Sequence, residues 1–275
     1  MDLSDSVLDH LRHVAAMPDL AATRYTLESE IGRGGMGVVY RAYDRELDRP
    51  VALKVLDAAL SGEARVIARL EHPSIVPVYE SGVLPDGRAF YTMKLVAGAR
   101  LDRYAAGSSS LAARLEAIRR VGEAVAFAHS RGAIHRDLKP QNIMVGEFGE
   151  VYVMDWGVEG VAGTAAFRAP EEGLSQASDI YSLGALLRFV LPAHSSPALG
   201  AIAAKAMAAD AATRYRSAAD FLQDLERFQE GLAVQAWAEP LWHRVRRFAS
   251  RNAVLLWLVA AYAGVRFFLF FLHPR

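Results

Sequence analysis

The sequence contains no cysteine among its 275 residues. This absence excludes disulfide bonds, thiolate nucleophiles and cysteine-based zinc sites, and it leaves the redox compartment open. An excess of one charge is also missing, because Lys and Arg total 31 and Asp and Glu total 31. No overall electrostatic field therefore draws the chain to nucleic acid, and no nucleic-acid partner is expected.

The N-terminus lacks the apolar stretch of a secretory signal. It carries Asp2, Asp5 and Asp9 instead, so we expect the main body to stay in the cytosol. Apolar residues at helical spacing over residues 4–16 predict a short amphipathic helix that Pro18 ends. Residues 1–24 are therefore expected to form an N-terminal helical extension.

Three polar side chains lie close together in the stretch His135–Asn142. Asp137, Lys139 and Asn142 are two and three residues apart. Asp137 can orient a hydroxyl and accept its proton, Lys139 can neutralise charge on a moving phosphoryl group, and Asn142 can offer an oxygen to magnesium. The stretch predicts phosphoryl transfer, and a polar loop with this order by chance is the alternative.

A glycine-rich segment follows the predicted strand 25–31. Gly32, Gly34 and Gly37 have a spacing that dinucleotide-binding folds share. Here a β-branched strand over residues 38–42 follows, where a dinucleotide-binding fold would have a helix. The pattern therefore favours a hairpin that closes over the phosphates of ATP.

Two charged side chains complete the predicted phosphate site. Lys54 is the one charged residue of the strand 51–56 and is the candidate to hold the α- and β-phosphates; a solvated strand lysine is the alternative. Asp155 ends the strand that begins at Glu150 and is followed by Trp156 and Gly157. A carboxylate at this place can chelate magnesium.

These stretches resemble the motifs of the eukaryotic-like Ser/Thr protein kinases of bacteria. The resemblance covers residues 25–231 and implies an α+β, two-lobed protein-kinase-like fold. A small β-rich N-lobe is expected over residues 25–96 and a mainly helical C-lobe over residues 97–231. The resemblance also implies ATP and Mg2+ as cofactors and a protein as substrate.

The resemblance assigns roles to individual residues. It implies a catalytic set of Asp137, Lys139, Lys54, Glu63 and Thr164, with Asn142 and Asp155 as metal ligands. It implies an ATP site of Gly32, Gly34, Gly37, Val39, Ala52, Lys54, Met93, Lys94, Leu95, Val96 and Met144. Structural roles fall to His135, Arg136, Gly157, Glu171, Asp179 and Arg214.

Several contacts follow from these roles. Asp179 is expected to hold the backbone of the catalytic loop, and Arg214 to pair with Glu171. Met93 is expected to gate the back of the adenine pocket, Lys94 to Val96 to offer hinge backbone groups, and Val39, Ala52 and Met144 to sandwich the adenine ring. Trp156 is expected to stack on His135 and Ile67.

Two helices of the family are shortened or missing in this sequence. Only nine positions separate Lys54 from Glu63, so the front of the helix that carries Glu63 is missing, and an exposed helix glutamate is the alternative reading of this residue. Between Phe189 and Pro197 almost nothing remains of the helix that usually follows. We expect a substrate-docking surface to be lost with that helix.

The C-terminal tail predicts a transmembrane helix. Residues 253–272 are apolar or small except Arg266. A basic juxtamembrane linker over residues 232–252 carries four arginines close to the N-terminal end of this apolar stretch. This pattern predicts a single-pass anchor in the inner membrane with the kinase domain in the cytoplasm. A hydrophobic helix docked on the C-lobe or the seam of a homodimer is the alternative.

The leading prediction is an active Ser/Thr protein kinase of minimal build that is anchored in the membrane. A pseudokinase that binds ATP and acts as a scaffold is the first alternative. A small-molecule kinase is disfavoured, because Gly163-Thr164 and Ala169-Pro170-Glu171 resemble the segment that presents a peptide.

Overall fold

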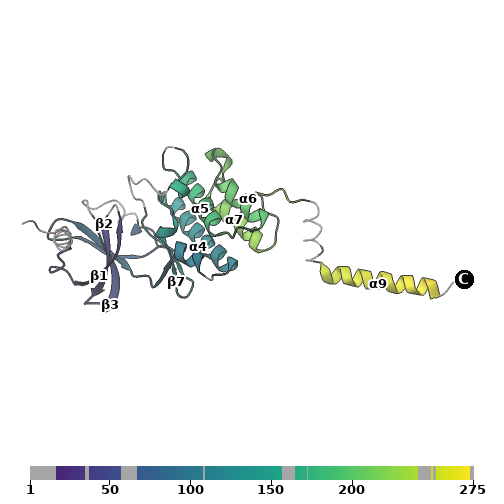
Figure 1. Cartoon of the computed structure of the whole chain (residues 1–275), viewed down its shortest axis with the longest axis horizontal. Coiled ribbons are helices and arrows are strands. Elements are labelled where there is room, and N and C mark those ends of the chain that lie inside the picture. Colours follow the sequence, from purple (N-terminus) through teal and green to yellow (C-terminus); the bar gives the residue numbers. More distant parts are fainter. Residues whose placement is uncertain are drawn as a thin grey trace, which may run out of the picture.

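The computed structural model describes residues 17–34, 37–56, 67–107, 109–156, 165–171, 173–240, 249 and 252–272. These residues form a β-rich lobe and a helical lobe joined side by side, with one further helix at the C-terminal end (Figure 1). The two-lobed α+β prediction is confirmed. The predicted helix over residues 4–16 and most of the one that carries Glu63 lie outside the described residues.

The N-lobe is a five-stranded antiparallel sheet with the strand order β1-β2-β3-β5-β4. Its strands are β1 (Tyr25–Gly34), β2 (Gly37–Asp44), β3 (Arg49–Leu56), β4 (Val78–Val83) and β5 (Ala89–Lys94). The central strand β3 is buried from Val51 to Leu56, and Lys54 is the one charged residue in that run. The sheet therefore places a single buried cation on its most protected strand.

The C-lobe is built around the helix α4 (Leu111–Ser130), whose apolar positions at helical spacing enter the main core. Ser110 caps its first turn by accepting a hydrogen bond from the N–H of Ala113 at 3.2 Å. Gly132 adopts a φ of 74° just beyond its end, which a residue with a Cβ rarely tolerates. The other helices of this lobe are α3 (Leu101–Ala106), α5 (Gln176–Val190), α6 (Pro197–Ala206) and α7 (Ala218–Gln229).

A small second sheet joins the two lobes. It contains β6 (Gly98–Arg100), β7 (Ile143–Gly146) and β8 (Val151–Val153) in the order β6-β7-β8. Val153 donates its N–H to the carbonyl of Ser74 at 2.9 Å and accepts from the N–H of Val76 at 3.3 Å. The chain leading into β4 is therefore hydrogen-bonded to the last residue of β8, two positions before Asp155.

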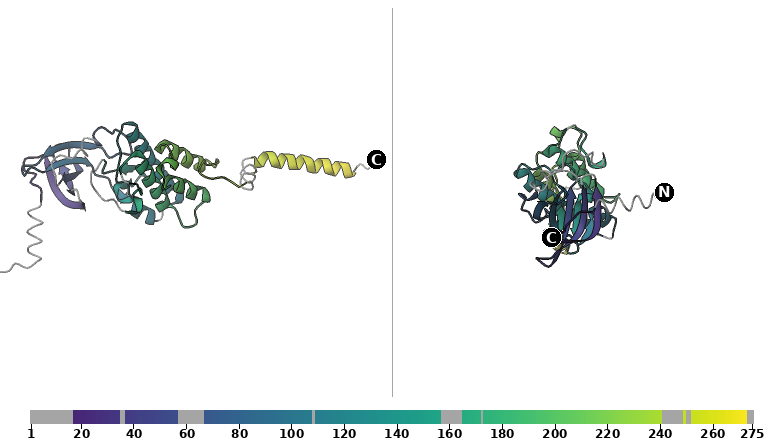
Figure 2. Two further views of the ribbon diagram at one scale, coloured as in Figure 1. Left: turned by 90° about the horizontal axis from the view of Figure 1, so that it is seen from above. Right: turned by 90° about the vertical axis from the view of Figure 1, so that its left-hand side faces the viewer.

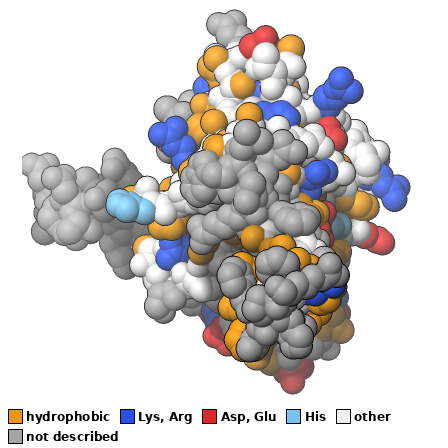
Figure 3. Space-filling model, turned by 90° about the vertical axis from the view of Figure 1, so that its right-hand side faces the viewer, with side chains coloured by type: hydrophobic (Ala, Val, Ile, Leu, Met, Phe, Trp, Pro, Cys, Tyr) orange, Lys and Arg blue, Asp and Glu red, His pale blue; other side chains and the backbone are white. Residues whose placement is uncertain are grey.

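The last helix, α9 (Ala253–Leu272), extends away from the helical lobe (Figure 2). The predicted helix forms over the predicted residues. Its described large apolar side chains are exposed; for example, Trp257 is 76% exposed and Phe267 is 67% exposed. Figure 3 views the molecule from the right-hand side of Figure 1, and orange hydrophobic side chains are visible in the lower part of that view.

The prediction that residues 253–272 cross a membrane is not supported. No helix in the described parts of the chain is both long enough and apolar enough to do so. Arg266 interrupts the apolar stretch of α9. Residues 253–265, which precede it, span about 20 Å at about 1.5 Å per residue, against a hydrocarbon core of about 30 Å.

The packing of α5 on α6 depends on Gly184. A Cβ built there would lie 2.6 Å from the Cβ of Ala206 and 3.0 Å from the backbone oxygen of Ala203. We predict that Gly184→Ala lowers the free energy of unfolding by about 1–3 kcal/mol, because the two helices would have to separate. Gly200→Ala in α6 is the matched control, since a Cβ there meets nothing within 4 Å.

Thermal and urea unfolding of the two variants measures this difference. Gly200→Ala should be neutral or stabilising, because alanine has the higher helix propensity. Equal stability of Gly184→Ala and the wild-type chain would contradict the close approach of the two helices.

Candidate active site

The catalytic loop holds the carboxylate of Asp137 in a fixed position. Lys139 donates from Nζ to Oδ2 of Asp137 at 2.6 Å. The amide nitrogen of Asn142, in the short 3-10 turn Pro140–Asn142, donates to the carbonyl of Asp137 at 2.8 Å and to its Oδ2 at 3.1 Å. The Asp137 side chain keeps 13% exposure, so a substrate hydroxyl has access to an otherwise fixed acceptor.

Asp179, in the first turn of α5, fixes the backbone of this loop from below. Its Oδ2 accepts from the N–H of His135 at 2.8 Å, and its Oδ1 accepts from the N–H of Arg136 at 3.0 Å. Its Oδ2 also lies 2.8 Å from Nε2 of His129 at the end of α4. Arg136 has a φ of 75°, a conformation that costs about 1–3 kcal/mol and that these two hydrogen bonds help to hold.

His135 is fully buried beneath the loop. Its Nδ1 accepts from the N–H of Asp137 at 3.3 Å, and its Nε2 lies 3.0 Å from the carbonyl of Met154, to which it donates. Trp156 packs on it with ring centroids 4.7 Å apart and shares one core with Ile67. Burial lowers the pKa of His135 below its usual value, so the neutral ring makes both hydrogen bonds.

Lys54 and Asp155 meet across the cleft between the lobes. The Nζ of Lys54 lies 2.8 Å from Oδ1 of Asp155, and the side chains are 6% and 32% exposed. Asp155 has a φ of 56°, which turns the chain directly after β8. The structure thus brings together the two charges that the sequence assigned to the phosphates and to magnesium.

The glycine-rich hairpin pairs β1 with β2 over this cleft. Gly32 lies opposite Val39, and Gly34 lies opposite Gly37. Gly37 has a φ of 136°, and a Cβ there would lie 1.9 Å from the carbonyl oxygen of Val55. Only glycine permits this approach of β2 to β3.

An apolar cluster lines the cleft beside Lys54. It contains Ala52 and Met93, with Val39, Leu95 and Val96 packed against it. These are five of the residues that the sequence assigned to the adenine site. Met144, the sixth apolar one, lies in the adjacent sheet and is partly buried.

Tyr152 is a member of this cluster that the sequence did not reveal. It is 9% exposed and lies opposite Met144 in the small sheet. Lys94 donates from Nζ to its hydroxyl at 2.5 Å, which raises the pKa of Lys94. The backbone N–H of Lys94 is bonded to the carbonyl of Pro77 at 3.2 Å, so this N–H is not available as one of the expected hinge groups.

The expected pair of Glu171 and Arg214 forms. Arg214 donates from both terminal nitrogens to the two carboxylate oxygens of Glu171, at 2.7 Å and 2.6 Å. These hydrogen bonds lower the pKa of Glu171. Arg214 also donates to the carbonyls of Ala177 and Ala208, so residues 165–171 are tied to the start of α5 and to the chain after α6.

Three predicted site residues, Glu63, Gly157 and Thr164, lie outside the described residues. Within the described parts, no group of three or more His, Asp or Glu side chains forms a ready-made metal site. A metal ion here would need further ligands from a bound nucleotide or water, as magnesium sites commonly do.

Comparison with known proteins matches the arrangement to a family. A model of the protein kinase domain matches residues 25–197. The chain belongs to the protein kinase family. The resemblance to the bacterial Ser/Thr members of that family is confirmed.

Three bacterial relatives support the same family. The chain is 37% identical over 205 residues to the serine/threonine-protein kinase PknL of Mycobacterium bovis, covering 64% of this chain and 51% of that protein. It is 33% identical over 281 residues to PknB of Mycolicibacterium smegmatis, covering 80% and 45%, and 29% identical over 297 residues to PknD of Protochlamydia amoebophila, covering 75% and 30%. The chain therefore spans only a third to a half of their lengths.

The residues of the cleft fit the nucleotide and metal that protein kinases generally use. Asn142 donates from its amide nitrogen to Asp137, which leaves its side-chain oxygen as the atom suited to a cation. Asp155 adds a partly exposed carboxylate, and Lys54 adds a buried ammonium for phosphate oxygens. The donor set is one that magnesium and a nucleoside triphosphate would satisfy together.

Buried His135 predicts a loss of stability in acid. The unfolded chain binds a proton at this histidine near pH 6.5, whereas the folded chain resists it because the pKa is lowered. The free energy of unfolding should therefore fall as the pH drops below about 6.5. In His135→Gln this fall should be shallower, since glutamine takes up no proton.

His194→Gln is the matched control, because His194 is exposed. Melting temperatures of the three proteins between about pH 7 and about pH 5 measure the slope. His194→Gln should follow the wild-type slope, and an unchanged slope in His135→Gln would contradict the neutral buried ring.

Proposed function

We propose that this chain is a protein serine/threonine kinase that transfers the γ-phosphoryl group of ATP to protein hydroxyls. The arrangement of Asp137, Lys139 and Asn142 carries the proposal, because Lys139 and Asn142 both donate hydrogen bonds to the carboxylate of Asp137. The kinase domain is proposed to extend over residues 25–231.

In the proposed reaction, Asp137 orients the substrate hydroxyl and accepts its proton as the oxygen bonds to the γ-phosphorus. The bond from that phosphorus to the oxygen of ADP breaks, and Lys139 offsets the charge on the moving group. Lys54 binds phosphate oxygens, while Asn142 and Asp155 would hold Mg2+. The metal ion would supply charge neutralisation for the phosphates when it is bound.

A pseudokinase scaffold is the weaker reading. A scaffold has no chemical need for Lys54, Asp137, Asn142 and Asp155, yet the structure holds them as two contacting pairs, Lys54 with Asp155 and Asn142 with Asp137. The hydrogen bonds that Asp179 accepts from the loop also favour catalysis, because they hold Arg136, directly before Asp137, in a strained backbone conformation.

Asp137→Asn should reduce kcat by about 100-fold or more, because it removes the proton acceptor. Nucleotide affinity should change little, since the cluster around Ala52 and Met93 and the charge of Lys54 are untouched. Phosphate transfer from labelled ATP to a generic basic protein measures kcat, and fluorescent nucleotide titration measures affinity. Asp220→Asn, an exposed position in α7, is the matched control.

Asp220→Asn should retain the wild-type rate. Equal rates for the wild-type chain and Asp137→Asn would show that a contaminating enzyme transfers the phosphate. The pseudokinase scaffold would then be the favoured function. Lys54→Met gives an independent reading, because it should weaken both phosphate binding and turnover.

We further propose that α9 attaches the kinase to the inner face of the cell membrane. Exposed Trp257, Tyr262, Phe267 and Phe268 on α9 support this proposal. The four arginines at positions 244, 246, 247 and 251 lie just before it, and cations attract anionic lipid.

The full-length chain should therefore sediment with vesicles that contain anionic lipid and resist release by high salt, because apolar contact is not screened. The double variant Trp257→Asp and Phe268→Asp should stay in the supernatant. Phe148→Asp is the control, since Phe148 is 94% exposed in the hairpin between β7 and β8. Complete release of the chain from the vesicles by high salt would show that the arginines alone attach it and that α9 does not.

A further inference from the structure

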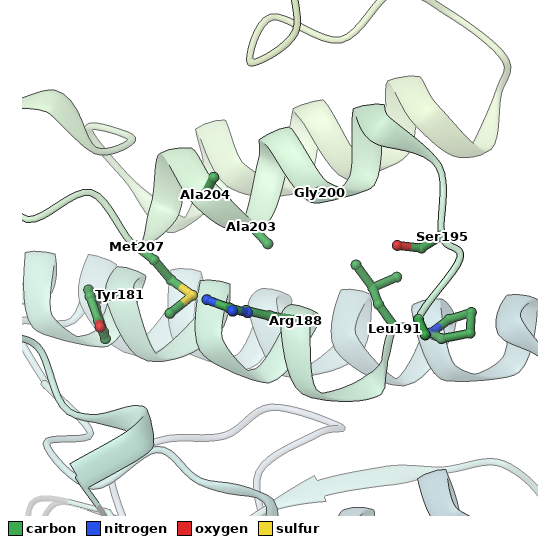
Figure 4. Close-up of a pocket in the computed structure, with 10 residues that line it drawn as sticks. Tyr181, Arg188, Leu191, Ser195, Gly200, Ala203, Ala204 and Met207 are labelled. Atoms are coloured by element: carbon green, nitrogen blue, oxygen red, sulfur yellow. The ribbon is translucent and has the colours of Figure 1, made fainter.

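A second cavity lies outside the cleft, between α5 and α6 (Figure 4). Its volume is about 750 Å³, within the range of about 300–1,000 Å³ that is usual for ligand pockets. Leu191, Ala203 and Met207 give it apolar walls, and Tyr181 and Ser195 add hydroxyls near its two ends.

The sequence explains why this space is open. The helix that the family places after α5 is missing, and a short turn over residues 191–196 leads directly into α6. On α6 the lining residues are Gly200, Ala203 and Ala204, which are too small to fill the gap. The cavity is therefore built into the fold rather than left by a displaced side chain.

Arg188 gives the cavity its charge. It is the only charged residue among those that line it, and Figure 4 shows its side chain running between the two helices toward Met207. Arg188 is exposed and has no hydrogen-bond or ion-pair partner within the described residues. The lining therefore suits a ligand with a carboxylate beside an aliphatic group.

The cavity is connected to the segment that follows the catalytic residues. The ring of Tyr181 lies 5.1 Å from the guanidinium of Arg214, which holds Glu171. Phe189, next to Arg188, packs edge-on against Phe167 at 5.8 Å. The cavity is thus linked by side-chain contacts to residues 165–171, the segment that resembles the peptide-presenting segment of the family.

We propose that this cavity docks a short acidic and aliphatic stretch of the protein substrate, with a carboxylate on Arg188 and aliphatic side chains against Leu191 and Met207. The identity of the occupant as a substrate rests on the proposed kinase function. The helix α9 of a second copy does not fit, because its sequence contains no acidic residue. The docking surface expected to be lost with the missing helix is replaced by a pocket.

Binding to the full-length chain tests the pocket without any turnover. The probe is a fluorescein-labelled peptide of alternating leucine and glutamate, with a leucine–lysine peptide as its control, and anisotropy gives the affinity. Arg188→Glu should weaken the acidic peptide about ten-fold or more, because a charge-assisted hydrogen bond becomes a repulsion. Arg216→Glu, at an exposed arginine that does not line the cavity, should leave the affinity unchanged.

Ala204→Trp should also block the acidic peptide, since the indole would fill the cavity without changing its charge. Equal binding of the acidic and basic peptides, or wild-type affinity in both Arg188→Glu and Ala204→Trp, overturns the proposal.

Kinetics then test docking of a substrate. One acceptor peptide carries the leucine–glutamate stretch behind a flexible spacer, and a second carries the spacer alone. The stretch should lower KM about ten-fold in the wild-type chain and not in Arg188→Glu, with kcat unchanged. Equal KM values for the two peptides overturn the docking of a substrate in this cavity. Absence of transfer to both peptides would refute the kinase function, and the anisotropy measurement alone would then decide whether the cavity binds the acidic peptide.

Discussion

The buried carboxylate of Asp179 is the interaction on which the catalytic half of the molecule depends. It is 1% exposed, and a buried carboxylate is unfavourable by several kcal/mol unless hydrogen bonds replace its water. Two backbone N–H groups of the catalytic loop and the ring of His129 supply them, and the first turn of α5 adds the favourable end of a helix dipole. The same bonds that satisfy the carboxylate fix α4, the loop and α5 relative to one another, so the position of Asp137 is set by the core.

A second constraint joins the lobes. The backbone of Val153 bonds to Ser74 and Val76, which ties the segment before the N-lobe strand β4 to the chain that leads into Asp155. Side chains add the contacts of Lys54 with Asp155 and of Lys94 with Tyr152. The cleft is therefore bounded by this backbone pairing and by the two side-chain contacts.

Contacts between residues that are close in the sequence could be predicted from it, whereas contacts between distant residues could be predicted only where the family resemblance implied them. The polar residues between His135 and Asn142 are close together in the sequence, and the helix α4 has a clear apolar periodicity. Both could therefore be identified from the sequence. The contact of Lys94 with Tyr152 spans 58 positions, and Tyr152 resembles any buried strand aromatic, so no local pattern revealed it. The short β6 and α3 have too few residues for a periodic signal. For the tail, the helix was predicted correctly, but its crossing of a membrane is not supported, because Arg266 interrupts the apolar run.

The helix α5 connects the catalytic loop with the cavity between α5 and α6. Its first turn carries Asp179 below the catalytic loop, its middle carries Ser182, which donates to the carbonyl of Phe167 at 2.8 Å, and its last turn carries Arg188 at the cavity. Asp179 and Arg188 lie nine residues apart on this helix, which is about 14 Å at about 1.5 Å per residue. An extended peptide covers that distance in about four residues, at about 3.3 Å each. Because both ends belong to one helix packed at Gly184 against α6, the distance between the catalytic loop and the cavity is fixed, and a substrate bound at both places must have its acidic stretch at a defined spacing from its phosphorylated hydroxyl.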